Sequence, residues 1–199
     1  MRIVVGISGG VDSALAAALL KELGWDVVGC YLKVVVEGAQ CPWADDLPMA
    51  HRIAAQLGIP LIVHDVSAAY EREVVAPMVA AYRAGTTPNP DALCNRWVKF
   101  DALADVARQV GAERIATGHY ARMIRTADLG IELHRGVDPI KDQSYFLWML
   151  TEAQLTMCEF PIGEWRKDDV RAEAQRRGLP NWDRPSTSGV CFLGAMDIG

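Results

Sequence analysis

Short apolar runs alternate with segments of helical periodicity over the first two-thirds of the chain, and glycine follows most of the helical segments. Short uninterrupted apolar runs are typical of strands buried on both faces, whereas apolar residues that recur every three to four positions indicate helices. The pattern predicts strands at 3–7, 27–32, 59–66 and 114–117, helices at 12–23, 46–57, 68–83 and 97–110, and a loop at 84–95. Such alternation with short connections predicts an α/β fold, a doubly wound parallel sheet with helices on both faces.

The last third of the chain has a different pattern. Residues 121–135 predict a β-hairpin, 166–178 predict a charged helix, and the terminus is rich in turn formers. We therefore expect a boundary near residue 138, between a sheet domain (1–138) and a small, mostly helical extension (139–199).

Composition adds limits on location and partners. Of the 199 residues 51% are hydrophobic, enough for a sizeable core, yet no apolar run approaches the roughly 20 residues that span a bilayer. The amino terminus has no signal-peptide pattern, so we expect a cytoplasmic protein with no membrane partner. The net charge of -5 provides no bulk attraction to nucleic acid, so an RNA partner would need local basic patches.

Five cysteines, an odd number with wide spacing, fit neither a disulfide framework nor a zinc motif. Cys30 lies in an apolar strand and is expected to pack in the core. Cys94 and Cys191 have turn formers nearby, and Asp91 precedes Cys94 by three residues. Such surroundings favour accessible, reactive thiols. Cys41 lies in another loop, with no role beyond a weak candidacy for sulfur relay.

The turn GISGGVDS joins the first strand to the first helix and gathers small and polar residues. Its members are Gly6, Ile7, Ser8, Gly9, Gly10, Val11, Asp12 and Ser13. A glycine-rich turn at a helix start directs backbone N–H groups at an anion, at the sheet edge where doubly wound folds bind ligands. Ser8 and Ser13 are expected to donate hydrogen bonds to phosphate, and Asp12 to hold Mg²⁺. The turn contains no lysine, which excludes a Walker A site.

SGGVDS in this position resembles the loop of the PP-loop ATP pyrophosphatases, whose fold is adenine nucleotide alpha hydrolase-like. Four further segments, AGTTPNPDALCNRWVKFDAL, ATGHYAR, LHRGVDPIKDQSYFLWML and SGVCFLG, occur with it in an order and spacing similar to those of the tRNA-specific 2-thiouridylases. The resemblance covers nearly the whole chain.

The resemblance implies a role for each matching position. It implies ATP contacts for the turn, for Leu32 and for Gly118. The substrate contacts that it implies are Asn89, Pro90, Asp91, His119, Lys141, Asp142 and Gln143. It implies that Cys94 and Cys191 are catalytic, together with Asp91 as a general acid or base.

The resemblance also implies a chemistry: ATP adenylates a nucleobase carbonyl oxygen, and a persulfide on Cys191 then replaces that oxygen with sulfur. Attack by Cys94 releases the product and leaves a disulfide for a reductant. The sulfur would come from a cysteine desulfurase, a relay protein or free sulfide. An alternative is that Cys94, Cys191 and Asp91 hold a [4Fe-4S] cluster.

Two departures from the family leave the acceptor open. LKVV stands after the second strand, where the family usually has Met-Lys-Asn-Trp, and the two β-rich domains that usually follow are not in this sequence. The acceptor is therefore either the wobble uridine of tRNA or a small nucleobase or nucleotide, such as a guanine nucleotide. A third alternative is a non-catalytic ATP-binding or sulfur-carrier subunit.

Overall fold

The computed structural model describes residues 1–36, 43–126 and 130–185. Cys41 and Cys191 lie outside these ranges, so the expectations for both thiols stay predictions.

The main sheet is parallel throughout and has the strand order β3-β2-β1-β4-β7 within the described residues. Its strands are β1 (Arg2–Gly6), β2 (Asp26–Lys33), β3 (Leu61–Asp65), β4 (Arg114–Ala116) and β7 (Cys158–Glu159). From β1 the chain adds β2 and β3 on one side, and it then crosses to add β4 and β7 on the other side of β1. This change in strand order confirms the predicted doubly wound fold. The two-residue strand β7 was not predicted, because so short a run has no detectable periodicity.

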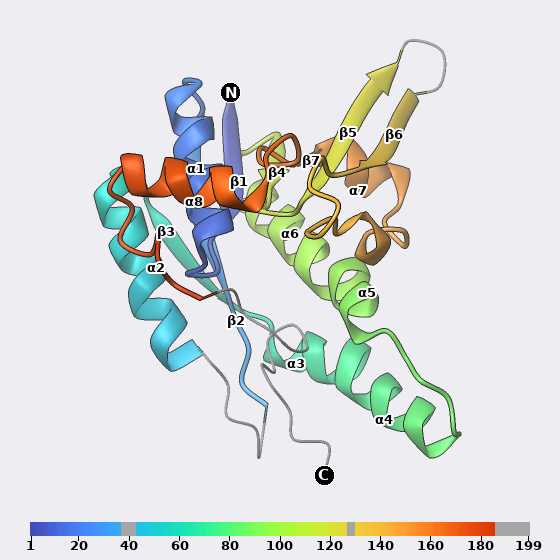
Figure 1. The fold of residues 1–199 in the computed structure, drawn as a ribbon. Helices are drawn as coiled ribbons and strands as arrows, with labels where there is room; N and C mark the ends of the chain where they lie inside the picture. Colours follow the sequence, from blue (N-terminus) through green and yellow to red (C-terminus); the bar gives the residue numbers. More distant parts are fainter. Residues whose placement is uncertain (37–42, 127–129, 186–199) are drawn as a thin grey trace.

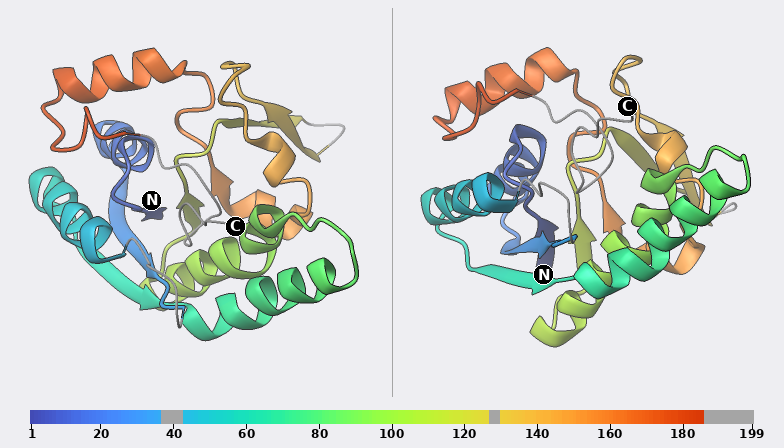
Figure 2. Two further views of the ribbon diagram at one scale, coloured as in Figure 1. Left: turned by 60° about the horizontal axis from the view of Figure 1, so that its bottom comes forward. Right: turned by 90° about the horizontal axis from the view of Figure 1, so that it is seen from below.

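Helices cover both faces of this sheet (Figures 1 and 2). One face carries α1 (Val11–Glu22), α2 (Trp43–Leu57) and α8 (Lys167–Arg176). The other carries α3 (Ser67–Tyr70), η1 (Glu71–Val75), α4 (Ala76–Arg83), α5 (Pro90–Cys94), η2 (Asn95–Lys99) and α6 (Phe100–Val110). Two separate clusters of buried apolar side chains, one on each face, form the core.

The structure corrects the predicted boundaries in two places. The loop expected at 84–95 ends early, because Asn89 caps a new helix and Pro90 occupies its first position. The helix predicted at 68–83 contains the π-helical turn η1, and the π-helical turn η2 overlaps the start of the helix predicted at 97–110. Hydrophobic periodicity does not reveal one extra residue in a helical turn, so neither π turn was predicted.

The chain after β4 forms the predicted hairpin, β5 (Ala121–Thr126) with β6 (Gly130–Arg135), which projects from the sheet (Figure 1). A 3-10 turn, η3 (Ser144–Phe146), and α7 (Glu152–Met157) follow. The segment beyond residue 138 then returns to add β7 beside β4 and α8 against α1. The boundary near 138 stays a proposal.

Among the described residues, no helix combines the length and the apolar character needed to cross a bilayer.

Candidate nucleotide-binding site

The turn between β1 and α1 is built as an anion-binding loop. Helix α1 begins without a side-chain cap on its first-turn N–H groups, so the helix has donors and a positive dipole end available for a ligand. The hydroxyl of Ser13 donates to the carbonyl of Gly10 at 3.0 Å and accepts from the backbone N–H of Ser8 at 3.2 Å. Ser13 is buried and holds the loop in shape, whereas Ser8 is exposed and stays a candidate phosphate donor.

Gly9 is held from two sides. Its φ of +84° favours glycine, and an added Cβ would lie 2.8 Å from the carbonyl oxygen of Asp46. Its own carbonyl accepts from Asn181 Nδ2 at 2.9 Å and from Arg184 at 3.3 Å. Arg184 also pairs with Asp46 at 2.6 Å, which opposes the rise in the pKa of that carboxyl caused by burial. Residues late in the chain thus fix the loop.

Gly118 lies directly behind the start of α1. A Cβ at this position would come within 2.6 Å of the Ser13 nitrogen and 2.7 Å of the Asp12 carbonyl carbon. Only glycine therefore lets the end of β4 pack against the loop. This close packing explains why glycine occupies position 118. The predicted contact of Gly118 with ATP stays a prediction.

Leu32 can offer its backbone to a ligand. The carbonyl of Cys30 accepts from the Ile7 N–H, so Cys30 faces β1. Backbone direction alternates along a strand, so Leu32 faces the same side, where β1 has already ended at Gly6. The Leu32 side chain is buried in the core. An adenine contact at this position would therefore use backbone atoms, which are insensitive to the departure LKVV.

Asp12 has partners that the sequence did not predict. Lys167 Nζ lies 2.6 and 2.7 Å from its two carboxylate oxygens, and the Tyr120 hydroxyl donates to it at 2.7 Å. The Lys167 side chain is only 11% exposed. Burial and the neighbouring Asp12 carboxylate raise the pKa of Tyr120, which keeps the phenol protonated as a donor. Lys167 is the first residue of a charged helix, and the sequence predicts that such a residue is exposed to solvent. The sequence therefore did not indicate that Lys167 lies at the loop.

The loop fits Mg²⁺ only with help from a nucleotide. Mg²⁺ is usually held by one or two carboxylates together with substrate phosphates. In the described part of the chain no three His, Cys, Asp or Glu side chains gather into a metal site. Asp12 could therefore supply one carboxylate, and phosphate oxygens and water would complete the coordination.

Helix α5 places Asp91 and Cys94 on adjacent turns. Asn89 accepts from the Ala92 N–H at 3.1 Å, so its side-chain oxygen serves as the cap of this helix. Asp91 is half-buried in the first turn, and Cys94 is fully buried in the core. The expectation of an accessible thiol is wrong for Cys94, because a capped helix rather than a loop carries it inward. Cys30 is buried as expected, and burial raises the pKa of its thiol to about 12.

His119 lies among aromatic rings. Its Nδ1 is 2.7 Å from the Thr117 hydroxyl, and the ring stacks on Phe100 with centroids 5.8 Å apart. Phe160 meets it edge-on at 6.2 Å. Complete burial lowers the pKa of His119 well below its usual value, so the imidazole is neutral at pH 7. Its predicted RNA contact would have to be made by a neutral ring.

The Lys141, Asp142 and Gln143 run is engaged within the fold. Asp142 accepts from the N–H groups of Gly136 and Ser144 at 3.0 and 3.2 Å. Gln143 accepts from the Tyr120 N–H at 3.0 Å, and the Lys141 N–H donates to Asp138 at 3.1 Å. These bonds connect the run to the strand end behind the loop. Their contacts with RNA stay predictions.

The iron–sulfur alternative stays a prediction. Of the three ligands that it requires, the described residues contain Cys94 and Asp91, which lie on α5. The third, Cys191, lies outside the described residues.

Comparisons with known proteins agree with this geometry. A family model described as a tRNA methyl transferase HUP domain matches residues 1–195. A protein of Halorhodospira halophila called tRNA-specific 2-thiouridylase MnmA is 48% identical over 99% of this chain and 52% of its own length. One of the same name from Akkermansia muciniphila is 46% identical over 99% of this chain and 56% of its own. The chain thus spans about half the length of these relatives.

Two solved structures share the fold. NMN synthetase from Francisella tularensis superposes with a TM-score of 0.58 at 17% identity, covering 94% of this chain and 66% of that one. A 4-thiouridine synthetase, solved with RNA and ATP, superposes with a TM-score of 0.56 at 17% identity, covering 96% of this chain and 45% of that one. Both likenesses support the predicted adenine nucleotide alpha hydrolase-like fold.

Proposed function

The chain belongs to the tRNA methyl transferase HUP domain family, and from this premise we propose that it is the catalytic part of an ATP-dependent tRNA 2-thiouridylase. The observation that carries the proposal is the lysine-free loop at the start of α1, in a chain 48% identical over 99% of its length to a protein called a tRNA-specific 2-thiouridylase. The family description mentions methyl transfer. We do not propose that reaction, because transfer of a methyl group does not require a polyphosphate-binding loop.

The first half-reaction activates the acceptor. The carbonyl oxygen of the wobble uracil attacks the α-phosphorus of ATP, pyrophosphate leaves, and an O-adenylated carbon results. The N–H groups of the loop bind the departing pyrophosphate, and Asp12 is the residue that would hold Mg²⁺. Bound Mg²⁺ would neutralise phosphate charge.

The second half-reaction exchanges oxygen for sulfur. The terminal sulfur of a Cys191 persulfide attacks the activated carbon and forms a carbon–sulfur bond. The Cys94 thiolate then attacks Cys191 Sγ, which breaks the bond between the two persulfide sulfurs and forms a Cys94–Cys191 disulfide. The electron pair left on the transferred sulfur forms C=S as AMP departs, and an external thiol reduces the disulfide.

Asp91 and Asn89 lie where they could orient the base beside Cys94. Asp91 is one turn before Cys94 on α5, so both side chains face a similar direction along the helix. A half-buried carboxyl can exchange a proton with the base while the carbonyl is activated. The Asn89 oxygen caps the helix, which leaves its amide N–H groups for a base.

The proposed partners are tRNA and a sulfur donor: a cysteine desulfurase or a relay protein, which passes persulfide sulfur to Cys191, or free sulfide. Free sulfide would form the persulfide by attacking Cys191 Sγ of the Cys94–Cys191 disulfide, which releases the Cys94 thiolate. The test is AMP formation by the purified chain with ATP, Mg²⁺, a reducing thiol, and a cysteine desulfurase with cysteine as the source of persulfide sulfur. It compares tRNA carrying a wobble uridine with guanine nucleotides. We expect AMP to depend on the tRNA.

The matched variants are Cys191→Ser and Cys30→Ser. Cys191→Ser should abolish sulfur transfer, whereas Cys30→Ser, a buried thiol with no proposed role, should retain it. Turnover with guanine nucleotides alone would replace the tRNA proposal with small-molecule thiolation. Full function with Cys191→Ser in a complex would indicate a non-catalytic ATP-binding subunit.

A further inference from the structure

A buried ammonium group lies at the nucleotide loop and is not explained by the sequence motif. Lys167 Nζ bridges both carboxylate oxygens of Asp12, at 2.6 and 2.7 Å. Asp12 is the second residue of α1, at the helix end that attracts anions. The loop from Gly6 to Ser13 contains no lysine or arginine. A Walker A loop carries its own lysine, whereas here a lysine from a distant part of the chain reaches the loop.

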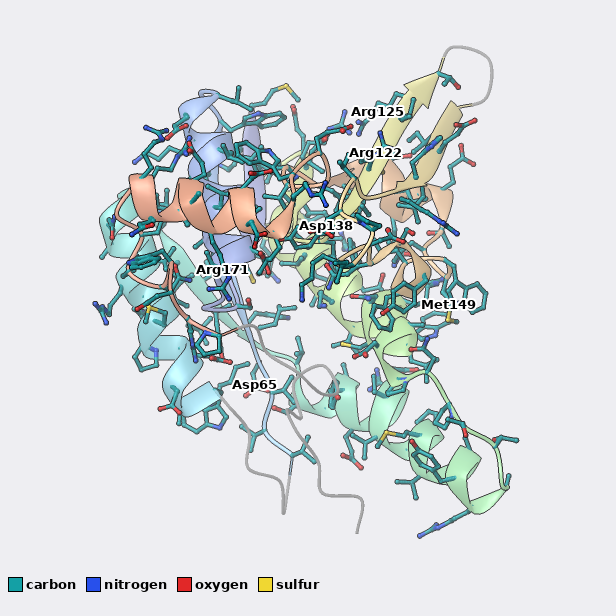
Figure 3. The ribbon with its side chains drawn as sticks, viewed as in Figure 1. Asp65, Arg122, Arg125, Asp138, Met149 and Arg171 are labelled. Atoms are coloured by element: carbon teal, nitrogen blue, oxygen red, sulfur yellow. The ribbon has the colours of Figure 1, made fainter. Side chains whose placement is uncertain are left out.

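The position of Lys167 is set by its backbone. Its N–H donates to Asp138 Oδ2 at 2.8 Å, and Asp138 Oδ1 accepts from the N–H groups of Ile140 and Lys141 at 2.9 and 3.1 Å. Figure 3 labels Asp138 beside the first turn of α8. The Tyr120 ring lies 5.7 Å from the ammonium. The side chain therefore reaches the loop from a fixed base.

The other nearby cation is committed elsewhere. Arg184 also reaches the loop, but its guanidinium donates to the carbonyl oxygen of Gly9 and pairs with Asp46. A carbonyl oxygen and a carboxylate occupy this cation, so it cannot leave without loosening the loop. Among the described residues, the hydrogen bonds of the Lys167 ammonium go to the Asp12 carboxylate, which also accepts a hydrogen bond from Tyr120.

We propose that the Lys167 ammonium is a phosphate-binding group of this site, leaving Asp12 for an oxygen of the β- or γ-phosphate when ATP binds. The inference rests on the proposed ATP-dependent function. A polyphosphate carries several negative charges, so it outcompetes a single carboxylate for the ammonium. Asp12 keeps the Tyr120 hydroxyl after the exchange, and its carboxylate becomes available to Mg²⁺. In the nucleotide-free protein, the Lys167–Asp12 ion pair thus neutralises both charges until ATP binds.

The experiment measures binding of pyrophosphate, of a non-hydrolysable ATP analogue and of adenosine to the full chain by calorimetry, with and without Mg²⁺. Lys167→Met should weaken pyrophosphate and analogue binding about 10- to 100-fold, the range for loss of one charged hydrogen bond. Adenosine binding should not change. The loss should persist in EDTA, because the lysine contact does not require the metal.

Arg166→Met is the control. Arg166 precedes Lys167 and is exposed, so its loss removes the same charge from the same helix end without touching the loop. Pyrophosphate binding should remain near that of the wild type. Equal or tighter pyrophosphate binding by Lys167→Met would overturn the proposal and leave Lys167 as a structural partner of Asp12. If the wild type binds no ATP analogue, the proposed function itself fails.

A second measurement needs no destabilising variant. In wild-type protein labelled with ¹⁵N-lysine, the Lys167 Nζ signal, assigned with Lys167→Arg, should shift on addition of pyrophosphate and not of adenosine. An unchanged signal at saturating pyrophosphate would mean that the ammonium stays on Asp12, and would overturn the proposal.

Discussion

At the residue scale, two tightly packed glycines and the buried Ser13 hydroxyl shape the nucleotide loop. Gly118 has no room for a side chain, since a Cβ would lie 2.6 Å from the Ser13 nitrogen. Gly9 accepts no side chain because of Asp46, and the Ser13 hydroxyl is used inside the loop. The loop is thus preformed before any ligand binds.

Gly118→Ala should displace the start of α1. Overpacking of this kind costs about 1–3 kcal/mol, and here the cost falls on the binding-competent loop. We expect ATP affinity to fall roughly 10- to 100-fold, measured by calorimetry. Gly24→Ala is the control: its φ of +83° makes alanine destabilising, but no atom lies within 4 Å of the new Cβ. Gly24→Ala should lower the melting temperature and leave ATP affinity intact; equal ATP affinity in both variants would refute the packing argument.

The buried thiols make a separate prediction. Cys94, Cys30 and Cys158 are fully buried, and burial raises the pKa of Cys30 and of Cys158. With iodoacetamide at pH 8, all three should be alkylated slowly in the native protein and rapidly in urea, as read by peptide mass spectrometry. Rapid native labelling of Cys94 without substrates would contradict the position of α5.

At the element scale, Asp138 connects the chain after the hairpin to the start of α8. Backbone N–H groups, that of Lys167 first, lower the pKa of the Asp138 carboxyl. A lowered folded-state pKa stabilises the protein above the unfolded value of about 3.9, and this contribution disappears as pH falls through the folded pKa. The start of α8, and with it Lys167, should therefore be most stable at neutral pH.

Asp138→Asn should destabilise the protein by about 1–3 kcal/mol at pH 7, because an amide N–H₂ would then face the Lys167 N–H. The difference from the wild type, measured by urea unfolding, should shrink below about pH 4 as the native carboxyl becomes protonated. A difference that stays constant down to pH 3 would contradict the assigned hydrogen bonds.

The order of elements could be predicted from the sequence, because buried strands and amphipathic helices each leave a periodic signal. The strand β7, the π turns and helix α5 could not. A two-residue strand has no period, and a capped helix beginning Asn-Pro reads as a turn. Likewise, the glycine-rich turn at the start of a helix could be predicted from GISGGVDS, whereas Lys167 depends on α8 packing across α1, which only the tertiary structure reveals.

At the scale of the whole molecule, the described segment after residue 138 contributes side chains to the nucleotide loop and is not a separate appendage. It supplies β7 to the sheet, Lys167 to Asp12, and Asn181 and Arg184 to Gly9. The nucleotide loop comes from the first turn of the chain and its supports from the last described residues. We therefore expect nucleotide binding to stabilise both parts together.

The central claim is that one ATP is cleaved for each sulfur placed on the wobble uridine. The most direct measurement incubates the chain with ATP, a cysteine desulfurase and its cysteine substrate, a reducing thiol and wobble-uridine tRNA, then quantifies AMP and 2-thiouridine from the same reaction. The account predicts equal amounts of the two, and neither with a tRNA that lacks the wobble uridine. AMP that accumulates while the tRNA gains no sulfur would contradict it.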